Sequence, residues 1–227
     1  MIFRKKQSSD DVGPELVGEV VSDVHGDGDS VAPGPSTTET ASVRERGPWD
    51  RSEVGDVEDR IDLGALLVAG VPGLSMQVQV DENTQRVTMV TLVLEDAAVQ
   101  IQAFAAPRSA GIWEDVRRQI SGSISGSGGL VETAEGTFGP ELRARVPGPD
   151  KNLQPARFVG VDGPRWFLRG LFLGSAASPE GHPGLTDVFA NIVVDRGSEA
   201  MPSGEPLPLR LPPQDPPDDS AEADSTT

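Results

Sequence analysis

The stretch VDGPRWFLRGLFLG, Val161–Gly174, predicts the centre of the fold, because a turn signal is followed by a nearly continuous apolar run. The dipeptide Asp162-Gly163 between two apolar runs predicts a two-residue hairpin turn, since glycine adopts a positive φ without strain. If Val161 faces Pro164, both faces of the hairpin are apolar. One face carries Val159, Val161, Trp166, Leu168 and Phe172, and the other carries Ala156, Phe158, Phe167, Leu171, Leu173, Arg165 and Arg169. We therefore expect this hairpin in the centre of its sheet, covered on both sides.

Arg165 and Arg169 then share a covered face, where an unpaired guanidinium would destabilise the fold. One interpretation is structural: the guanidinium groups reach the rim of the sheet or form ion pairs with a core acid. The candidate acids are Glu132, Glu141 and Asp187. The other interpretation is an anion-binding cleft for a carboxylate or phosphate, built from Arg157, Arg165 and Arg169. Both interpretations remain open from the sequence.

Outward from the hairpin, alternating or continuous apolar runs predict further strands. Three strands form a meander at residues 74–80, 86–94 and 98–105, and four more follow at residues 130–135, 141–146, 156–161 and 165–173.

Two segments have apolar residues at helical spacing. The first carries Ile112, Trp113, Val116, Ile120 and Ile124, with Ser109 as the expected N-cap, and the second carries Leu185, Val188, Phe189, Ile192 and Val193 and ends near Gly197. The order βββ-α-ββββ-α predicts an α+β fold, a single domain in which helices pack on an antiparallel sheet. Trp113 and Trp166 are expected in its core.

The 227-residue chain has 36 acidic and 19 basic side chains and a net charge of −17. Its two ends are acidic and poor in aromatic residues, so we predict disordered acidic tails at residues 1–46 and 213–227. A single domain then spans residues 47–212, with a core at about 61–197 and a proline-rich extension. In that extension, EPLPLRLPP, the leucines Leu207, Leu209 and Leu211 are expected to pack on the domain, and the alternative is that they fill a partner's groove.

The composition excludes several kinds of site. The chain has no cysteine, which excludes disulfides and thiolate chemistry. The sequence shows neither a signal peptide nor an apolar run of membrane-spanning length, so we expect a cytoplasmic protein that does not enter the membrane. A strong negative charge argues against binding duplex nucleic acid. The acidic run DVHGDGDS lacks the glutamate that a calcium loop needs at its twelfth position, so no metal is predicted.

Catalytic groups are scarce. The chain has two histidines and no tyrosine. His182 beside Pro183 is expected to be a loop or capping residue rather than a general base. No catalytic residue and no cofactor are predicted, and whether the protein is an enzyme stays open, with the balance against it.

Five motifs occur in a fixed order between Gly47 and Pro212: GPWDRSEV, RIDLGALLV, QAFAAPRS, PARFVGVDGPRWFLRG and EPLPLRLP. With these motifs the chain resembles the actinobacterial domain-of-unknown-function family 3710 (DUF3710) over about residues 47–212. The resemblance implies a cytoplasmic actinobacterial protein and supplies no activity, cofactor or site residue. The predicted element order is also similar to the Mog1/PsbP-like arrangement, whose members mostly serve as binding or assembly factors.

The sequence therefore predicts a non-catalytic binding or assembly module with a protein partner whose identity is unknown. The alternative function is a small-molecule enzyme or a nucleotide- or anion-binding accessory protein, with its site near the Arg165/Arg169 hairpin.

Overall fold

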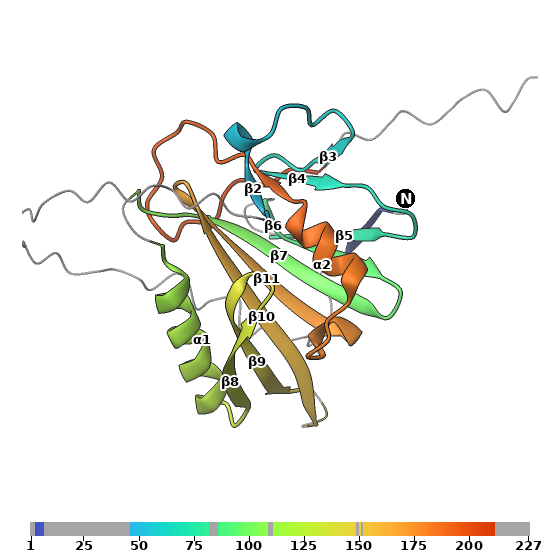
Figure 1. Cartoon of the computed structure of the whole chain (residues 1–227), viewed down its shortest axis with the longest axis vertical. Coiled ribbons are helices and arrows are strands. Elements are labelled where there is room, and N and C mark those ends of the chain that lie inside the picture. The colour runs from blue at the N-terminus through green and yellow to red at the C-terminus, as the bar shows by residue number, and fades with distance from the viewer. Residues whose placement is uncertain are drawn as a thin grey trace, which may run out of the picture.

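The structure is a computed structural model that describes residues 3–6, 46–81, 86–108, 111–148, 150 and 152–211, and for residues 3–6 it describes the backbone alone. These residues form an α+β domain with a large sheet, a small sheet and two α-helices (Figure 1). The chain segments beyond these ranges, which include most of the two predicted tails, lie outside the described residues. The tail and domain boundaries therefore stay predictions.

The large sheet has eight strands in the order β1-β5-β6-β7-β11-β10-β9-β8. Their bounds are β1 (Phe3–Lys6), β5 (Ser75–Val80), β6 (Val87–Leu94), β7 (Ala97–Ala105), β8 (Leu130–Gly136), β9 (Gly139–Pro147), β10 (Leu153–Gly163) and β11 (Trp166–Gly174). The strand β1 pairs in parallel with β5, and every other neighbouring pair is antiparallel. The predicted meander and the four following strands are confirmed. The hairpin β10–β11 lies at the centre, as expected.

The turn of this hairpin lies two residues later than predicted. Gly163 pairs with Trp166, so Pro164 and Arg165 form the turn, and Arg165 adopts a φ of 64°. Gly163 is required where it is, because a Cβ there would lie 2.0 Å from the indole ring of Trp166. The turn at Asp162-Gly163 was a wrong prediction, yet the shift of register is even, so the residues that lie in β10 and β11 keep the faces assigned to them. Arg165 is the exception, because it belongs to the turn and not to a strand.

The small sheet was not predicted. Its strand order is β2 (Trp49–Asp50), β12 (Val193–Val194), β4 (Leu66–Ala69) and β3 (Arg60–Asp62). The second helix was predicted to end near Gly197, which is too far along the chain. The helix α2 (Pro183–Ala190) ends before Ile192, and Val193 belongs to β12. The backbone of β12 pairs with β2 on one side and with β4 on the other. Because of this pairing, Val193 lies in a strand although its spacing from Phe189 is typical of a helix.

The helix α1 (Trp113–Gly126) buries Trp113, Val116, Ile120 and Ile124, four of the five apolar residues that predicted it. Ser109 is not its N-cap, because the helix begins later, with Ile112 in the N-cap position, and Ser109 lies outside the described residues. The carboxylate of Asp162 accepts hydrogen bonds from the backbone N–H groups of Ile112 at 2.8 Å and Trp113 at 3.3 Å. The central hairpin thus caps the helix that covers it.

The two α-helices lie on opposite sides of the large sheet (Figure 1). On the side of α1, Phe158, Phe167 and Leu171 pack with Trp113. The opposite side holds the larger core, which includes Trp166 and the apolar residues of α2 and of the small sheet. Trp113 is 6% exposed and Trp166 is 0% exposed, which confirms both as core residues.

The proline-rich extension packs on the domain. Leu207 and Leu209 are buried, whereas Leu211 is exposed, so the packing prediction holds for two of the three leucines. The extension continues the large sheet beside the end of β7: Leu207 N–H donates to the Ala103 carbonyl at 2.9 Å, and Ala105 N–H donates to the Glu205 carbonyl at 2.8 Å.

Candidate functional site

The structure does not bring the three predicted arginines together. In the register of the adjacent strands β10 and β11, Arg157 lies opposite Phe172 and Arg169 lies opposite Gly160. Arg157 and Gly160 are three positions apart on β10, so the side chains of Arg157 and Arg169 lie on opposite faces of the large sheet. Arg157 lies on the face of α2, and Arg169 lies on the face of α1. Arg165 is half-buried in the turn between the strands. A single cleft therefore does not contain all three.

Arg157 is almost fully buried but incompletely paired. Its side chain is 4% exposed, and its Nη1 lies 3.5 Å from Glu141 Oε2. The guanidinium carbon lies 4.4 Å from the centre of the Phe172 ring. Burial lowers the pKa of Arg157, an effect that Glu141 opposes and Arg143 reinforces. Within the described residues, Nε and Nη2 of Arg157 have no hydrogen-bond partner.

Glu141 is the acid that joins two arginines. Its side chain is 1% exposed, and Arg143 Nε donates to its Oε1 at 3.0 Å while Arg157 contacts its other oxygen. Gly136 permits this placement, since a Cβ there would lie 2.0 Å from Glu141 Oε2. Glu141 was one of the three acids expected to pair with Arg165 or Arg169, but its arginine partners in the structure are Arg157 and Arg143.

The Arg157–Glu141–Arg143 group lies beside a pocket of about 430 Å³. The wall opposite these strand residues comes from the segment that links the 3-10 helix η3 (Ser175–Ala177) to the first turn of α2. The lining residues are Arg46, Glu135, Gly136, Thr137, Glu141, Arg143, Arg157, Pro179, Glu180, Pro183, Thr186 and Asp187. Charges of both signs therefore meet in one concave site of a size that accommodates a small ligand.

Arg169 has no acidic partner in the part of the chain that the structure describes. Its side chain is 5% exposed, donates through Nη2 to Gln102 Oε1, and lies over the Phe104 ring at 5.6 Å from the centroid. Its Nη1 has no hydrogen-bond partner among the described residues. Burial lowers the pKa of Arg169 to about 10. The expected ion pair between Arg169 and Glu132, Glu141 or Asp187 is not found, because the side chains that its guanidinium contacts are the amide of Gln102 and the ring of Phe104.

Replacing Arg169 with methionine is expected to leave the free energy of unfolding at pH 7 unchanged or to raise it by up to about 3 kcal/mol. Burial holds the folded-state pKa of Arg169 at about 10, below that of an arginine in water, so the unfolded chain binds this proton more tightly. The destabilisation by Arg169 is complete below pH 10 and is relieved as the pH rises above 10. Urea denaturation of both proteins at pH 7 and pH 11 measures this, and a clear loss of stability in the variant at pH 7 would contradict it.

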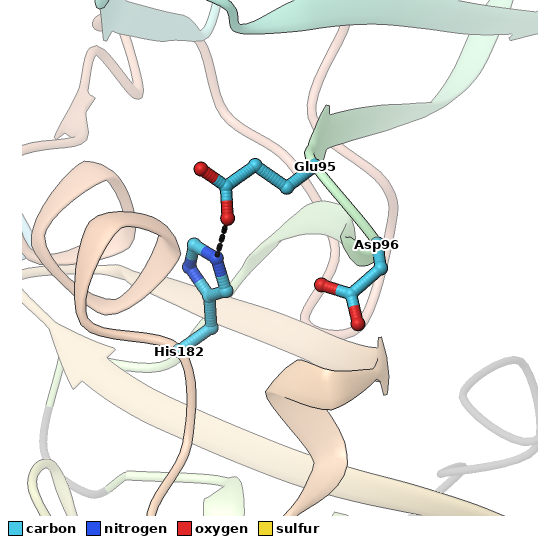
Figure 2. Close-up of side chains that lie close together, drawn as sticks. All are labelled: Glu95, Asp96 and His182. Carbon is cyan, nitrogen blue, oxygen red and sulfur yellow. Dashed lines mark ion pairs between the residues drawn. The ribbon is translucent and has the colours of Figure 1, made fainter.

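Glu95, Asp96 and His182 form a cluster (Figure 2), in which one carboxylate oxygen of each acid and one ring nitrogen of His182 lie within 4.8 Å of one another. His182 Nδ1 accepts a hydrogen bond from the Leu185 N–H at 3.2 Å and so caps α2. In that tautomer Nε2 carries the proton, and it lies 3.5 Å from Glu95 Oε2. A metal ion at Nε2 would need the lone pair that this proton occupies. The geometry is that of a helix cap held by a carboxylate, which confirms the predicted capping role of His182.

The family described as "Protein of unknown function (DUF3710)" matches residues 47–217. The chain belongs to the DUF3710 family. No curated protein and no solved structure matches this chain. The resemblance expected for residues 47–212 is confirmed over nearly the same range.

In this DUF3710 domain, the pocket residues around Arg157 were mostly missed from the sequence. The alternation of Glu141 and Arg143 along one face of β9 was the available signal, since residues two apart on a strand point to the same side. The wall that carries Glu180 and Asp187 is far away in sequence, and only the packing of α2 brings it to β9.

Among the described helices of this DUF3710 domain, none is long and apolar enough to cross a membrane.

Proposed function

We propose that this domain is a non-catalytic binding module that takes an anionic group in the Arg157 pocket. The observation that carries the proposal is a guanidinium 4% exposed, beside a pocket, with two N–H nitrogens that bond to no described residue. A buried donor without an acceptor is costly, and an anionic ligand removes that cost.

The two unbonded nitrogens of Arg157 are suited to bidentate recognition. Nε and Nη2 form one edge of the guanidinium fork, which donates two parallel hydrogen bonds to a carboxylate or a phosphate. Nη1, on the other edge, stays with Glu141. Both unbonded nitrogens are covered by protein, so the anion reaches them only when the segment around Gly181 shifts. Gly181 has a φ of 68°, and a Cβ there would lie 3.4 Å from Arg157 Nη2.

The pocket is better suited to binding than to catalysis. Both oxygens of Glu141 are engaged by arginines, and neither a histidine nor a serine lines the pocket among the described residues. The buried carboxylate of the lining is thus held by ion pairs, and the other acids, Glu135, Glu180 and Asp187, are exposed, which favours binding over acid–base chemistry.

Thermal unfolding with added glutarate or phosphate tests the proposal. At an anion concentration ten times the dissociation constant, the wild-type midpoint is expected to rise by about 3 °C. Arg157→Lys keeps the charge but loses the planar fork, so it should abolish the rise. Arg169→Met, on the opposite face of the adjacent strand, is the matched control and should keep it. Absence of any anion-dependent rise in the wild-type protein overturns the proposal.

The Arg165/Arg169 hairpin is the second candidate site, for a nucleotide- or anion-binding accessory protein or a small-molecule enzyme. Its supporting observation is the unbonded Nη1 of Arg169 in a place with no acidic partner among the described residues. The same experiment separates the two sites: loss of the anion response in Arg169→Met with retention in Arg157→Lys favours the hairpin.

The proposed module acts in the cytoplasm of an actinobacterium and engages a protein partner or a free anionic molecule through a carboxylate or phosphate. The net charge of −17 favours such a partner over duplex nucleic acid. A Mog1/PsbP-like arrangement, with the binding role common among its members, belongs to this proposal as a fold analogy.

A further inference from the structure

Three carboxylates line the Arg157 pocket without an ion pair. Glu135, Glu180 and Asp187 are exposed, and none of them pairs with a basic side chain in the described part of the chain. They share the pocket with Arg157, which is itself incompletely bonded. Opposite charges therefore face one cavity and do not neutralise each other.

We propose that the ligand of this pocket is a small zwitterion, an amino acid or a short peptide. The inference rests on the proposed anion site and adds to it the class of ligand. The carboxylate of the ligand binds Arg157, and its ammonium group faces the carboxylates of the rim.

The charge distribution favours a zwitterion over a simple anion. Four carboxylates line the pocket when Glu141 is included, against the three arginines Arg46, Arg143 and Arg157. A dianion placed near Arg157 would be repelled by the three unpaired acids, whereas an ammonium group on the same ligand converts this repulsion into attraction. The volume of about 430 Å³ admits a molecule of that size.

The three exposed acids of the rim, Glu135, Glu180 and Asp187, come from two walls of the pocket, and their positions orient the ligand. Glu135 lies near the end of β8, Glu180 precedes α2, and Asp187 lies within α2. Because Arg157 is buried and the three acids are exposed, the ligand lies with its carboxylate inward and its ammonium outward.

The test compares L-glutamate with glutarate, which has the same carbon chain and lacks the amino group. Isothermal titration is expected to give an affinity for L-glutamate about tenfold higher than for glutarate, because one additional charge-assisted hydrogen bond strengthens binding by about this factor. Triglycine and N-acetyltriglycine form the second pair, in which acetylation removes the ammonium charge. The variant Asp187→Asn combined with Glu180→Gln and Glu135→Gln should remove the preference and leave glutarate binding equal or stronger. All three residues are exposed, so the triple variant should fold. Glu58→Gln, an exposed acid that does not line the pocket, is the control and should change nothing.

The outcomes separate this inference from the proposed function. Equal affinity for both members of each pair overturns the zwitterion and leaves the anion site standing. No binding of any of the four probes overturns both. A preference for the amino compounds that survives in the triple variant also overturns the inference, because the ammonium would then be recognised elsewhere.

Discussion

Replacing Glu141 with glutamine is expected to lower the free energy of unfolding by about 3–5 kcal/mol. The substitution preserves shape and removes the charge between Arg157 and Arg143, whose contacts with Glu141 are 3.5 Å and 3.0 Å. Arg157 is 4% exposed, so water cannot replace the lost carboxylate. Urea denaturation followed by tryptophan fluorescence measures the loss.

Glu132→Gln is the matched control for this substitution. Glu132 lies opposite Arg143 on the neighbouring strand, but it is exposed, so its replacement should change stability by less than about 0.5 kcal/mol. Combining Glu141→Gln with Arg157→Met should cost less than the sum of the two single changes, since the buried guanidinium is then absent. An effect of Glu141→Gln as small as that of Glu132→Gln would show that the buried ion pair does not matter for folding.

Replacing Trp166 with alanine is expected to cost about 3–5 kcal/mol. Trp166 is 0% exposed in the larger core, and its Nε1 donates to Asp50 Oδ2 at 2.7 Å. Since Asp50 belongs to β2, the indole ties the central hairpin to the small sheet. The substitution therefore opens a cavity and removes a contact between the two sheets.

Trp166→Phe separates these two effects, because it keeps most of the apolar volume and loses the hydrogen bond, at a cost of about 1–2 kcal/mol. Leu130→Ala, at a position that is 60% exposed, should have almost no effect. The account of the core is wrong if Trp166→Ala is as stable as Leu130→Ala in the same denaturation experiment.

The faces of the central hairpin could be predicted from the sequence although its turn could not. A strand residue changes face only if the turn is misplaced by an odd number of residues. The predicted turn at Asp162-Gly163 lies two residues before the observed turn at Pro164-Arg165, so the faces were unaffected. The small sheet could not be predicted, because β2 and β12 each have two residues, too few for a period, and they pair across most of the chain.

The partners of the arginines differed in how far they could be predicted. Glu141 lies on β9, two positions from a second arginine, so its pairing with Arg157 follows from strand alternation once β9 and β10 are neighbours. Arg169 bonds to an amide and to no acid of the described residues because the strand beside β11 is β7, which offers Gln102 opposite it. The cap that Asp162 provides to α1 joins residues 50 positions apart and leaves no local signal.

The most direct test of the central claim is the ¹H–¹⁵N signal of Arg157 Nε during titration with glutarate. The signal is assigned by its absence in Arg157→Lys. We expect the Arg157 Nε–H proton to shift downfield and saturate as glutarate binds, because a free donor gains a charge-assisted hydrogen bond, while the signal of Arg169 stays in place. If the Arg157 signal does not move when glutarate saturates the protein, the anion does not bind Arg157 and the proposed function is contradicted.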